Sequence, residues 1–128
     1  MSRDIPARSL HATADKVAAH AELVRDFNPL HLDPDFAAQT PFGGPIVHGS
    51  LMMNLLVDTL ERAGGADFVN GTLRLRFAAP APVGAVLTAG GAASSEAAGV
   101  YDVWVRREDG TTVVSGTLVP AGHGAAPQ

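Results

Sequence analysis

The feature that most constrains the fold is the segment Gly49–Ala63, which is apolar over most of a helical circumference. The residues that recur at the i, i+3, i+4, i+7 spacing of an α-helix are Leu51, Met52, Leu55, Leu56, Thr59 and Leu60. Met53 and Val57 extend this stripe sideways. Because a helix that is apolar nearly all round is normally buried among other elements, we predict a central helix wrapped by the rest of the chain.

Strand-like alternation follows this helix. The four predicted strands are Thr72–Phe77, Val86–Ala92, Val100–Arg106 and Thr111–Val119. Asp109-Gly110 is typical of a tight hairpin between the last two strands, because this pair tolerates positive φ. One apolar helix followed by a run of antiparallel strands predicts an α+β fold in which the sheet curves around the helix.

Two shorter helices are predicted before the central one. The first covers Ala14–Arg25, and the second covers Pro34–Gln39 with Asp33 as its N-cap and proline at its first position. Two prolines and two glycines predict a loop over Thr40–Pro45. The face of the first helix predicted to be buried consists of Val17, Ala21 and Val24.

Length and composition exclude several classes of protein. The 128 residues suit a single domain, which we expect to be structured over about residues 10–120 and frayed at 121–128. A hydrophobic share of 46% against 17% charged residues argues against disorder. There is no cysteine, so disulfides, thiolate metal sites and cysteine nucleophiles are excluded.

Charge and hydropathy limit the partners and the location. With nine basic residues against thirteen acidic ones, the chain lacks the basic surface that nucleic-acid binding needs. The first residues contain no apolar signal-peptide core, and no window of the sequence approaches the length of a membrane span. We therefore expect a cytoplasmic protein that binds neither nucleic acid nor membrane.

The segment from Asp26 to His31 combines an acid with a base. Asp26 lies at the end of the first predicted helix, and Pro29 enforces a turn before His31. We expect this turn, which the side chain of Asn28 stabilises, to bring the carboxylate and the imidazole together. A carboxylate and an imidazole that share a water form a pair suited to proton transfer near neutral pH.

The start of the central helix supplies a different kind of group. The first N–H groups of a helix have no partner within it and lie at the positive end of its dipole. Gly49 and Ser50 occupy this position, and glycine lets another oxygen approach the backbone closely. This predicts an oxyanion site that suits the enolate formed from a carbonyl substrate.

The same residues also have purely structural interpretations. Asp26 alone can cap a turn, and His31 can be a hydrogen-bonded core residue. For His48 we favour a structural hydrogen bond at the start of the helix over catalysis. For Ser50 we favour helix capping over nucleophilic attack, because no G-x-S-x-G motif surrounds it. His31 and His48 lack a third patterned ligand, so no metal site is predicted. The histidines expected on the surface are His11, His20 and His123.

The sequence resembles a known family at these positions. The segment Asp26–His31, DFNPLH, resembles the D-x-N-P-[aliphatic]-H signature of the MaoC-like hot-dog dehydratases, and is most similar to the (R)-specific enoyl-CoA hydratase type. Pro45–Gly49, PIVHG, and Leu75–Pro80, LRFAAP, also resemble that family in order and spacing. The resemblance extends over roughly residues 10–120.

The resemblance implies a hot-dog fold and the reversible syn addition of water to a trans-2-enoyl thioester, giving the (R)-3-hydroxyacyl form. It implies that Asp26 and His31 hold the water and move its protons, and that the Gly49 N–H stabilises the enolate. The residues assigned to substrate binding are Asn28, His48 and Ser50. The family's reaction needs no metal and no redox cofactor, its substrates are acyl-CoA or acyl-carrier-protein thioesters, and its members usually form dimers.

Several alternatives stay open in the sequence. A hot-dog acyl-CoA thioesterase, a 3-hydroxyacyl-carrier-protein dehydratase subunit and a non-enzymatic partner subunit are the competing functions. Acyl length and the choice between CoA and carrier protein follow from no spacing rule. Arg25 departs from the family pattern beside Asp26, and we expect it to face solvent. The other arginines considered for phosphate or acidic-surface contacts, with outward strand positions favoured, are Arg74, Arg76, Arg106 and Arg107.

Overall fold

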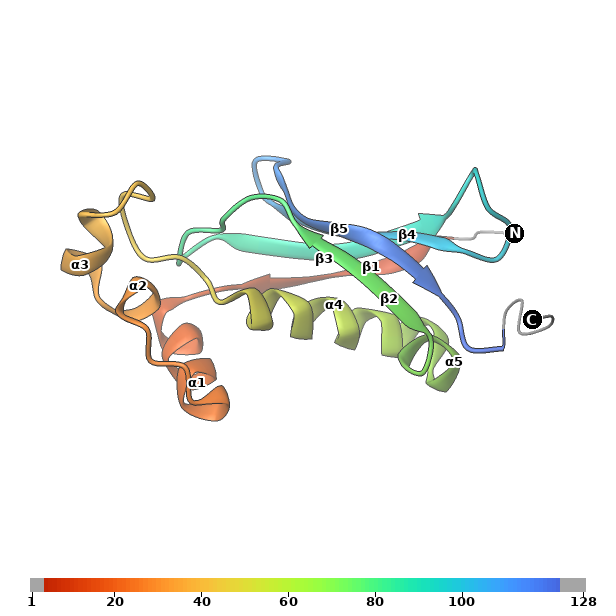
Figure 1. Cartoon of the computed structure of the whole chain (residues 1–128), viewed down its shortest axis with the longest axis horizontal. Helices are drawn as coiled ribbons and strands as arrows, with labels where there is room; N and C mark the ends of the chain where they lie inside the picture. The colour runs from red at the N-terminus through yellow and green to blue at the C-terminus, as the bar shows by residue number, and fades with distance from the viewer. Residues whose placement is uncertain (1–3, 123–128) are drawn as a thin grey trace.

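The computed structural model describes residues 4–122. The elements in chain order are β1 (Ile5–His11), α1 (Ala14–Val24), α2 (Pro29–Leu32), α3 (Pro34–Ala38), α4 (Gly49–Gly64), α5 (Ala66–Val69), β2 (Thr72–Phe77), β3 (Val86–Ala93), β4 (Tyr101–Arg107) and β5 (Thr112–Val119). Figure 1 shows the sheet lying along α4, with α1, α2 and α3 gathered beyond the N-terminal end of this helix and α5 at its other end.

The five strands form one antiparallel sheet in the order β1-β3-β4-β5-β2. The four predicted strands are confirmed to within one residue at each end. The predicted hairpin at Asp109-Gly110 is also confirmed, since Gly110 adopts a φ of 88° there. β1 was not predicted, so the ordered part of the chain begins earlier than residue 10.

The core lies between α4 and the sheet, which confirms the α+β prediction. Met52, Leu56 and Leu60 form the buried face of α4, which packs on β1, β3 and β4. The strand residues that complete this core include Leu87, Val103, Val105, Val114 and Leu118. Burial of these side chains supplies the main driving force that seats α4 on the sheet.

The sheet curves along one side of α4, as predicted, while part of the rest of the helix stays exposed. Met53 is 38% exposed, and Val57 is only partly buried. The sheet covers the side of the helix that carries Met52, Leu56 and Leu60. The apolar surface that the sequence gives α4 is therefore larger than one copy of the chain can bury.

The segment before α4 differs from the prediction in three places. α1 ends at Val24, because Arg25 adopts a left-handed φ of 61°, and Val24 itself is 40% exposed, contrary to the predicted face. Pro29 starts the short helix α2, where only a turn was predicted. α3 follows its predicted cap, with the Asp33 carboxylate accepting from the N–H groups of Asp35 and Phe36.

The predicted frayed tail lies outside the described residues except for its first two positions, which form a turn. His123 lies outside them too, whereas His11 is exposed as predicted. Across residues 4–122, no helix combines the length and the apolar character that crossing a membrane requires.

Candidate active site

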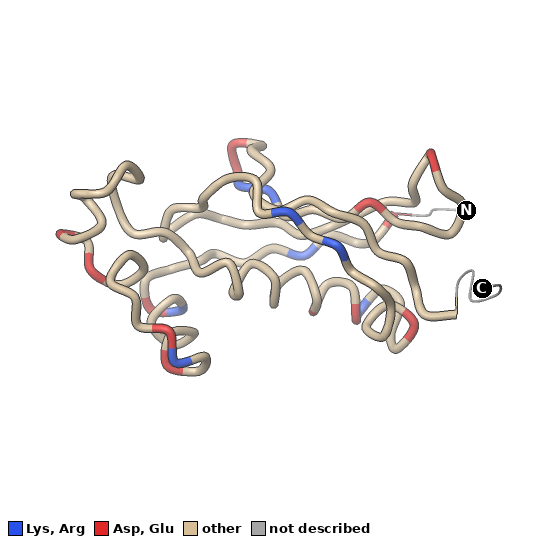
Figure 2. The backbone as a smooth tube through the Cα atoms, viewed as in Figure 1, with Lys and Arg blue, Asp and Glu red and all other residues tan. Residues whose placement is uncertain are grey.

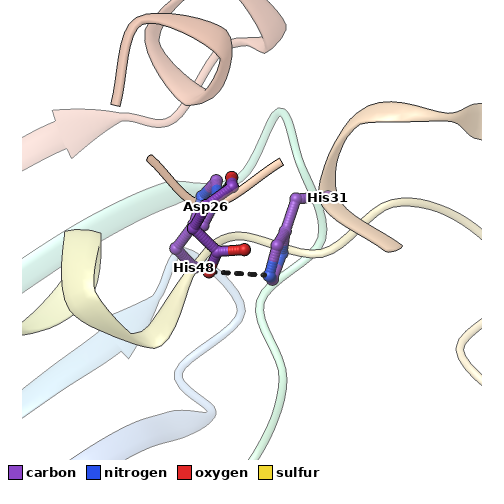
Figure 3. Close-up of side chains that lie close together, drawn as sticks. All are labelled: Asp26, His31 and His48. Carbon is purple, nitrogen blue, oxygen red and sulfur yellow. Dashed lines mark hydrogen bonds and ion pairs between the residues drawn. The ribbon is translucent and has the colours of Figure 1, made fainter. Parts of the chain in front are cut away.

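Local backbone geometry brings Asp26 and His31 together. The left-handed Arg25 redirects the chain after α1, and Asp26 Oδ1 then accepts the Asn28 N–H at 3.2 Å. Asn28 Oδ1 accepts the Leu30 N–H at 2.9 Å and caps α2, so the predicted stabilising contact of Asn28 is confirmed. His31 is the third residue of α2, and its Nε2 lies 3.9 Å from Asp26 Oδ2 (Figure 3).

One hydrogen bond determines which nitrogen of His31 is available. His31 Nδ1 lies 2.7 Å from the carbonyl oxygen of Ile46. Because a carbonyl only accepts, Nδ1 carries the proton of the neutral ring, and Nε2 keeps its lone pair facing Asp26. The His31 side chain is 12% exposed and that of Asp26 is 47% exposed, so the pair lies at a boundary between protein and solvent. In its neutral form the His31 ring therefore presents the Nε2 lone pair to the gap in front of the Asp26 carboxylate.

The separation between the two groups leaves room for one bridging water. At 3.9 Å, His31 Nε2 and Asp26 Oδ2 are too far apart for a direct hydrogen bond. A water about 2.8 Å from each atom would donate to both at an angle of about 90°. Its lone pairs would then point away from both groups.

His48 supports Asp26 from behind. It is 1% exposed, and its Nε2–H donates to the Asp26 carbonyl at 3.1 Å. Its ring stacks on that of His31 with centroids 3.8 Å apart. This confirms the structural hydrogen bond favoured for His48. His48 is also the N-cap residue of α4, so the interpretation of Ser50 as the cap is wrong.

A pocket of about 430 Å³ opens beside this cluster. His31 and Gly49 line it together with a mainly apolar set: Phe42, Ile46, Val47, Met52, Phe77, Ala78, Ala79 and Pro80. Gly49 is the first residue of α4, so its N–H has no partner within the helix. A Cβ placed on Gly49 would lie 3.1 Å from Phe77 Cε2, so glycine keeps this part of the wall open.

His20 was predicted to lie on the surface, and this is wrong. It is 5% exposed, and its Nε2 lies 2.7 Å from Ser50 Oγ. Burial, followed by the nearby His48, lowers the pKa of the His20 imidazole. The contact turns the Ser50 hydroxyl toward α1, and neither residue lines the pocket.

Asp26, His31 and His48 are the described residues that come nearest to a metal site, with one ligand atom from each within 4.8 Å of the others. Two of their nitrogens already donate to backbone carbonyls. The His31 and His48 rings also stack at an interplanar angle of 26°. The remaining nitrogen of the His48 ring, Nδ1, is buried. The donor set therefore fits a bridging water better than a metal.

None of the described arginines lines this pocket. Arg25 is exposed, as expected, and lies over the Phe27 ring. Arg107 is committed to Asp109 and to the Pro80 carbonyl. Figure 2 shows other basic residues along the edge strand β2 and on other strands of the sheet. These are the exposed Arg74 and Arg76 on β2 and Arg106, which stacks over Trp104 on β4.

Comparison with known proteins agrees with the family signature. The family model described as MaoC like domain matches residues 3–115. The (R)-specific enoyl-CoA hydratase of Aeromonas caviae is 47% identical over 77 residues, which are 59% of this chain and only 58% of that enzyme. The 3-hydroxyacyl-thioester dehydratase Z of Mycobacterium tuberculosis (strain ATCC 25618 / H37Rv) is 33% identical over 118 residues, covering 85% of this chain and 76% of the relative.

Solved structures agree with the sequence relatives. The (R)-hydratase from A. caviae involved in PHA biosynthesis superposes with a TM-score of 0.79 at 33% identity, covering 94% of each chain. This neighbour confirms the predicted hot-dog fold, in which an antiparallel sheet curves around a long helix. The sequence match and the shared architecture extend over most of the chain, including the residues that form the Asp26–His31 cluster. The chain therefore belongs to the MaoC-like domain family.

Proposed function

We propose that this protein is a hydro-lyase that catalyses the reversible syn addition of water to a trans-2-enoyl thioester, forming the (R)-3-hydroxyacyl thioester. The observation that carries this proposal is the 3.9 Å separation of Asp26 Oδ2 from His31 Nε2, with the His31 proton held on the other nitrogen. The relatives named as hydratases and dehydratases of acyl thioesters support the reaction class.

In this proposal the water between the two groups is the nucleophile. Donating its hydrogens to Asp26 and His31 leaves a lone pair free to attack C3 of the enoyl group. One of the two groups accepts the water's proton as the C–O bond forms, and it then delivers that proton to C2 of the enolate. Because the addition is syn, the proton must reach C2 from the same face of the double bond that the water attacks. Asp26 and His31 both lie on that face in this proposal, because they hold the water.

The Gly49 N–H is the proposed donor to the thioester oxygen. Attack at C3 moves negative charge onto that oxygen, and a backbone N–H at the positive end of α4 stabilises it. Gly49 and His31 line the same pocket, so oxyanion donor and base act on one substrate. The apolar remainder of the pocket suits an acyl chain. The step needs neither a metal nor a redox cofactor.

Asn28, His48 and Ser50 were assigned to substrate binding, and these assignments stay predictions. The contacts of Asn28 and His48 favour a supporting function, since both bond backbone groups near Asp26 or within α2. The thioester carrier is either CoA or a carrier protein, in line with relatives named for each. Exposed Arg74 and Arg76 are the candidates for contact with its phosphates or acidic surface.

We further propose that the active form is a homodimer. The uncovered side of α4 around Met53 and the edge strand β2 offer apolar surface and free backbone groups to a second copy. Phe77, at the end of β2, is 52% exposed although it lines the pocket. A second copy paired along β2 would cover Phe77 and complete the wall of the pocket. The cytoplasmic location stays a prediction.

The test is hydration of a panel of trans-2-enoyl-CoA substrates of increasing length, followed by loss of the enoyl absorbance and by the chirality of the product. Asp26→Asn and His31→Ala should each lower kcat by about 10²–10⁴-fold, the usual contribution of an acid–base group. Asp35→Asn, an exposed carboxyl on α3, is the matched control and should keep full activity. Full turnover by either active-site variant would contradict the assignment, and thiol release without hydration would indicate a thioesterase.

A further inference from the structure

His20 forms a buried polar contact that the proposed reaction does not use. It lies on α1, and its Nε2 meets the Ser50 hydroxyl at 2.7 Å in the first turn of α4. Burying polar groups costs free energy that hydrogen bonding only offsets, so two apolar side chains would join these helices more simply. The pair therefore calls for an explanation beyond helix packing.

The His20 ring contacts the residue that holds Asp26. His20 and His48 meet edge to face, with centroids 5.0 Å apart and an interplanar angle of 65°. The His48 ring has one hydrogen bond, from Nε2–H to the Asp26 carbonyl, and its buried Nδ1 has no partner within residues 4–122. Since imidazole torsions have a broad, roughly two-fold preference, one hydrogen bond alone fixes the ring weakly. The neighbouring His20 and His31 rings must supply the remaining restraint.

We propose that His20 and Ser50 are positioning residues for the hydratase reaction proposed above, on which this inference rests. Ser50 holds the His20 ring, and the edge-to-face contact between the two rings restrains His48. His48 in turn fixes the Asp26 main chain, and through it the 3.9 Å gap between Asp26 Oδ2 and His31 Nε2. His20 and Ser50 lie outside the pocket lining, so this inference assigns them a role through His48, in place of the substrate contact predicted for Ser50.

The charge state of His20 agrees with this arrangement. Burial is the largest cause that lowers its pKa, followed by His48, while Asp26 raises the pKa and His31 lowers it. A neutral His20 contacts the His48 ring without adding a cation beside the catalytic pair. The groups that shift the pKa of His20, namely His48, Asp26 and His31, are therefore the same groups that His20 is proposed to position.

The kinetic test uses His20→Phe, which keeps an aromatic ring, Ser50→Ala, and the double variant. Each single change should lower kcat about tenfold while KM stays within twofold, because a small misplacement of reacting groups affects the chemical step. The double variant should be no slower than the slower single one, since both changes break the same link. Ser50→Thr, which retains a hydroxyl, should recover most of the turnover.

Val17→Ala is the matched control, because Val17 is a buried residue of α1 that lies outside the cluster. It should lower thermal stability and leave kcat unchanged. Unchanged kcat in His20→Phe and Ser50→Ala would overturn the inference. So would losses that multiply in the double variant, or an equal loss of kcat in Val17→Ala, which would indicate general helix packing.

A readout independent of turnover separates this inference from the proposed function. Long-range ¹H–¹⁵N spectra of the imidazoles should show His48 as the Nε2–H tautomer and His31 as the Nδ1–H tautomer. Ser50→Ala and His20→Phe should mix the tautomers of His48. If the unchanged protein hydrates no enoyl thioester, the proposed function fails and these spectra still decide the inference. His48 signals identical in all three proteins would refute it.

Discussion

Replacing Gly49 by alanine should change the turnover of the protein much more than its stability. The new Cβ would lie 3.1, 3.5 and 3.7 Å from three atoms of the Phe77 ring. Only the first distance is shorter than an ordinary contact, by a few tenths of an ångström. Phe77 is 52% exposed, so its ring can move by that amount without disturbing the core. Alanine also lowers the conformational entropy of the unfolded chain, a gain of about 0.5–1 kcal/mol in helices. The two effects nearly cancel, and the thermal midpoint should shift by less than about 4 °C.

The effect of Gly49→Ala on turnover should be much larger. The methyl group would occupy the space between the Gly49 N–H and Phe77, where the proposed thioester oxygen approaches. Loss of one oxyanion donor typically lowers kcat by about 10²–10³-fold, or about 2.7–4 kcal/mol. The prediction is therefore a stable protein with strongly reduced hydration.

The assay pairs thermal unfolding with initial rates of enoyl-CoA hydration. A Gly49→Ala protein with a kcat within threefold of the parent would refute the oxyanion assignment. The double variant with Phe77→Leu adds a second check. If removing the ring restores turnover, the loss comes from the displaced Phe77 and not from the blocked amide, and the reasoning is again wrong.

Three further predictions concern stability. Burial lowers the pKa of His20, so below about pH 6.5 the unfolded chain binds more protons than the folded protein. The free energy of unfolding should therefore decrease as the pH falls through that range. Chemical denaturation should show a shallower decrease in His20→Phe. Leu56→Ala, at a side chain with 0% exposure, should cost about 2–5 kcal/mol in the same assay, and a cost below 1 kcal/mol would contradict the described core. Asp33→Ala removes the cap of α3 and should cost about 1 kcal/mol with kcat unchanged, checked by thermal unfolding and initial rates.

The elements with strong periodicity were predictable. α4 combines a clear apolar stripe with a glycine stop, and the later strands alternate cleanly, so local pattern and tertiary environment agree. β1 escaped prediction because it is an edge strand with one buried residue, Ile5, and its pairing with β3 shifts register between Ile5 and Arg8. A strand whose pairing is mainly through its backbone leaves little trace in side-chain pattern.

The acid–base pair was predictable because its residues are close in sequence, whereas its supports are not. Asp26 and His31 share one turn, but the carbonyl that selects the His31 tautomer belongs to Ile46, fifteen residues on. A backbone oxygen has no signature in the sequence. Only the fold places it.

His20 did have a signal. It lies three residues after Val17 and one before Ala21, on the face whose apolar members are buried. Histidine on such a face is expected to be buried and partnered. The prediction favoured Val24 instead, which is 40% exposed because α1 ends there.

The most direct measurement of the central claim is a high-resolution structure with a bound, non-reactive enoyl-thioester analogue. We predict one water within hydrogen-bond distance of both Asp26 Oδ2 and His31 Nε2, facing C3 of the analogue. We also predict the thioester oxygen about 2.7–3.1 Å from the Gly49 nitrogen. A carbonyl directed away from Gly49, or an Asp26–His31 gap with no water facing C3, would contradict the account.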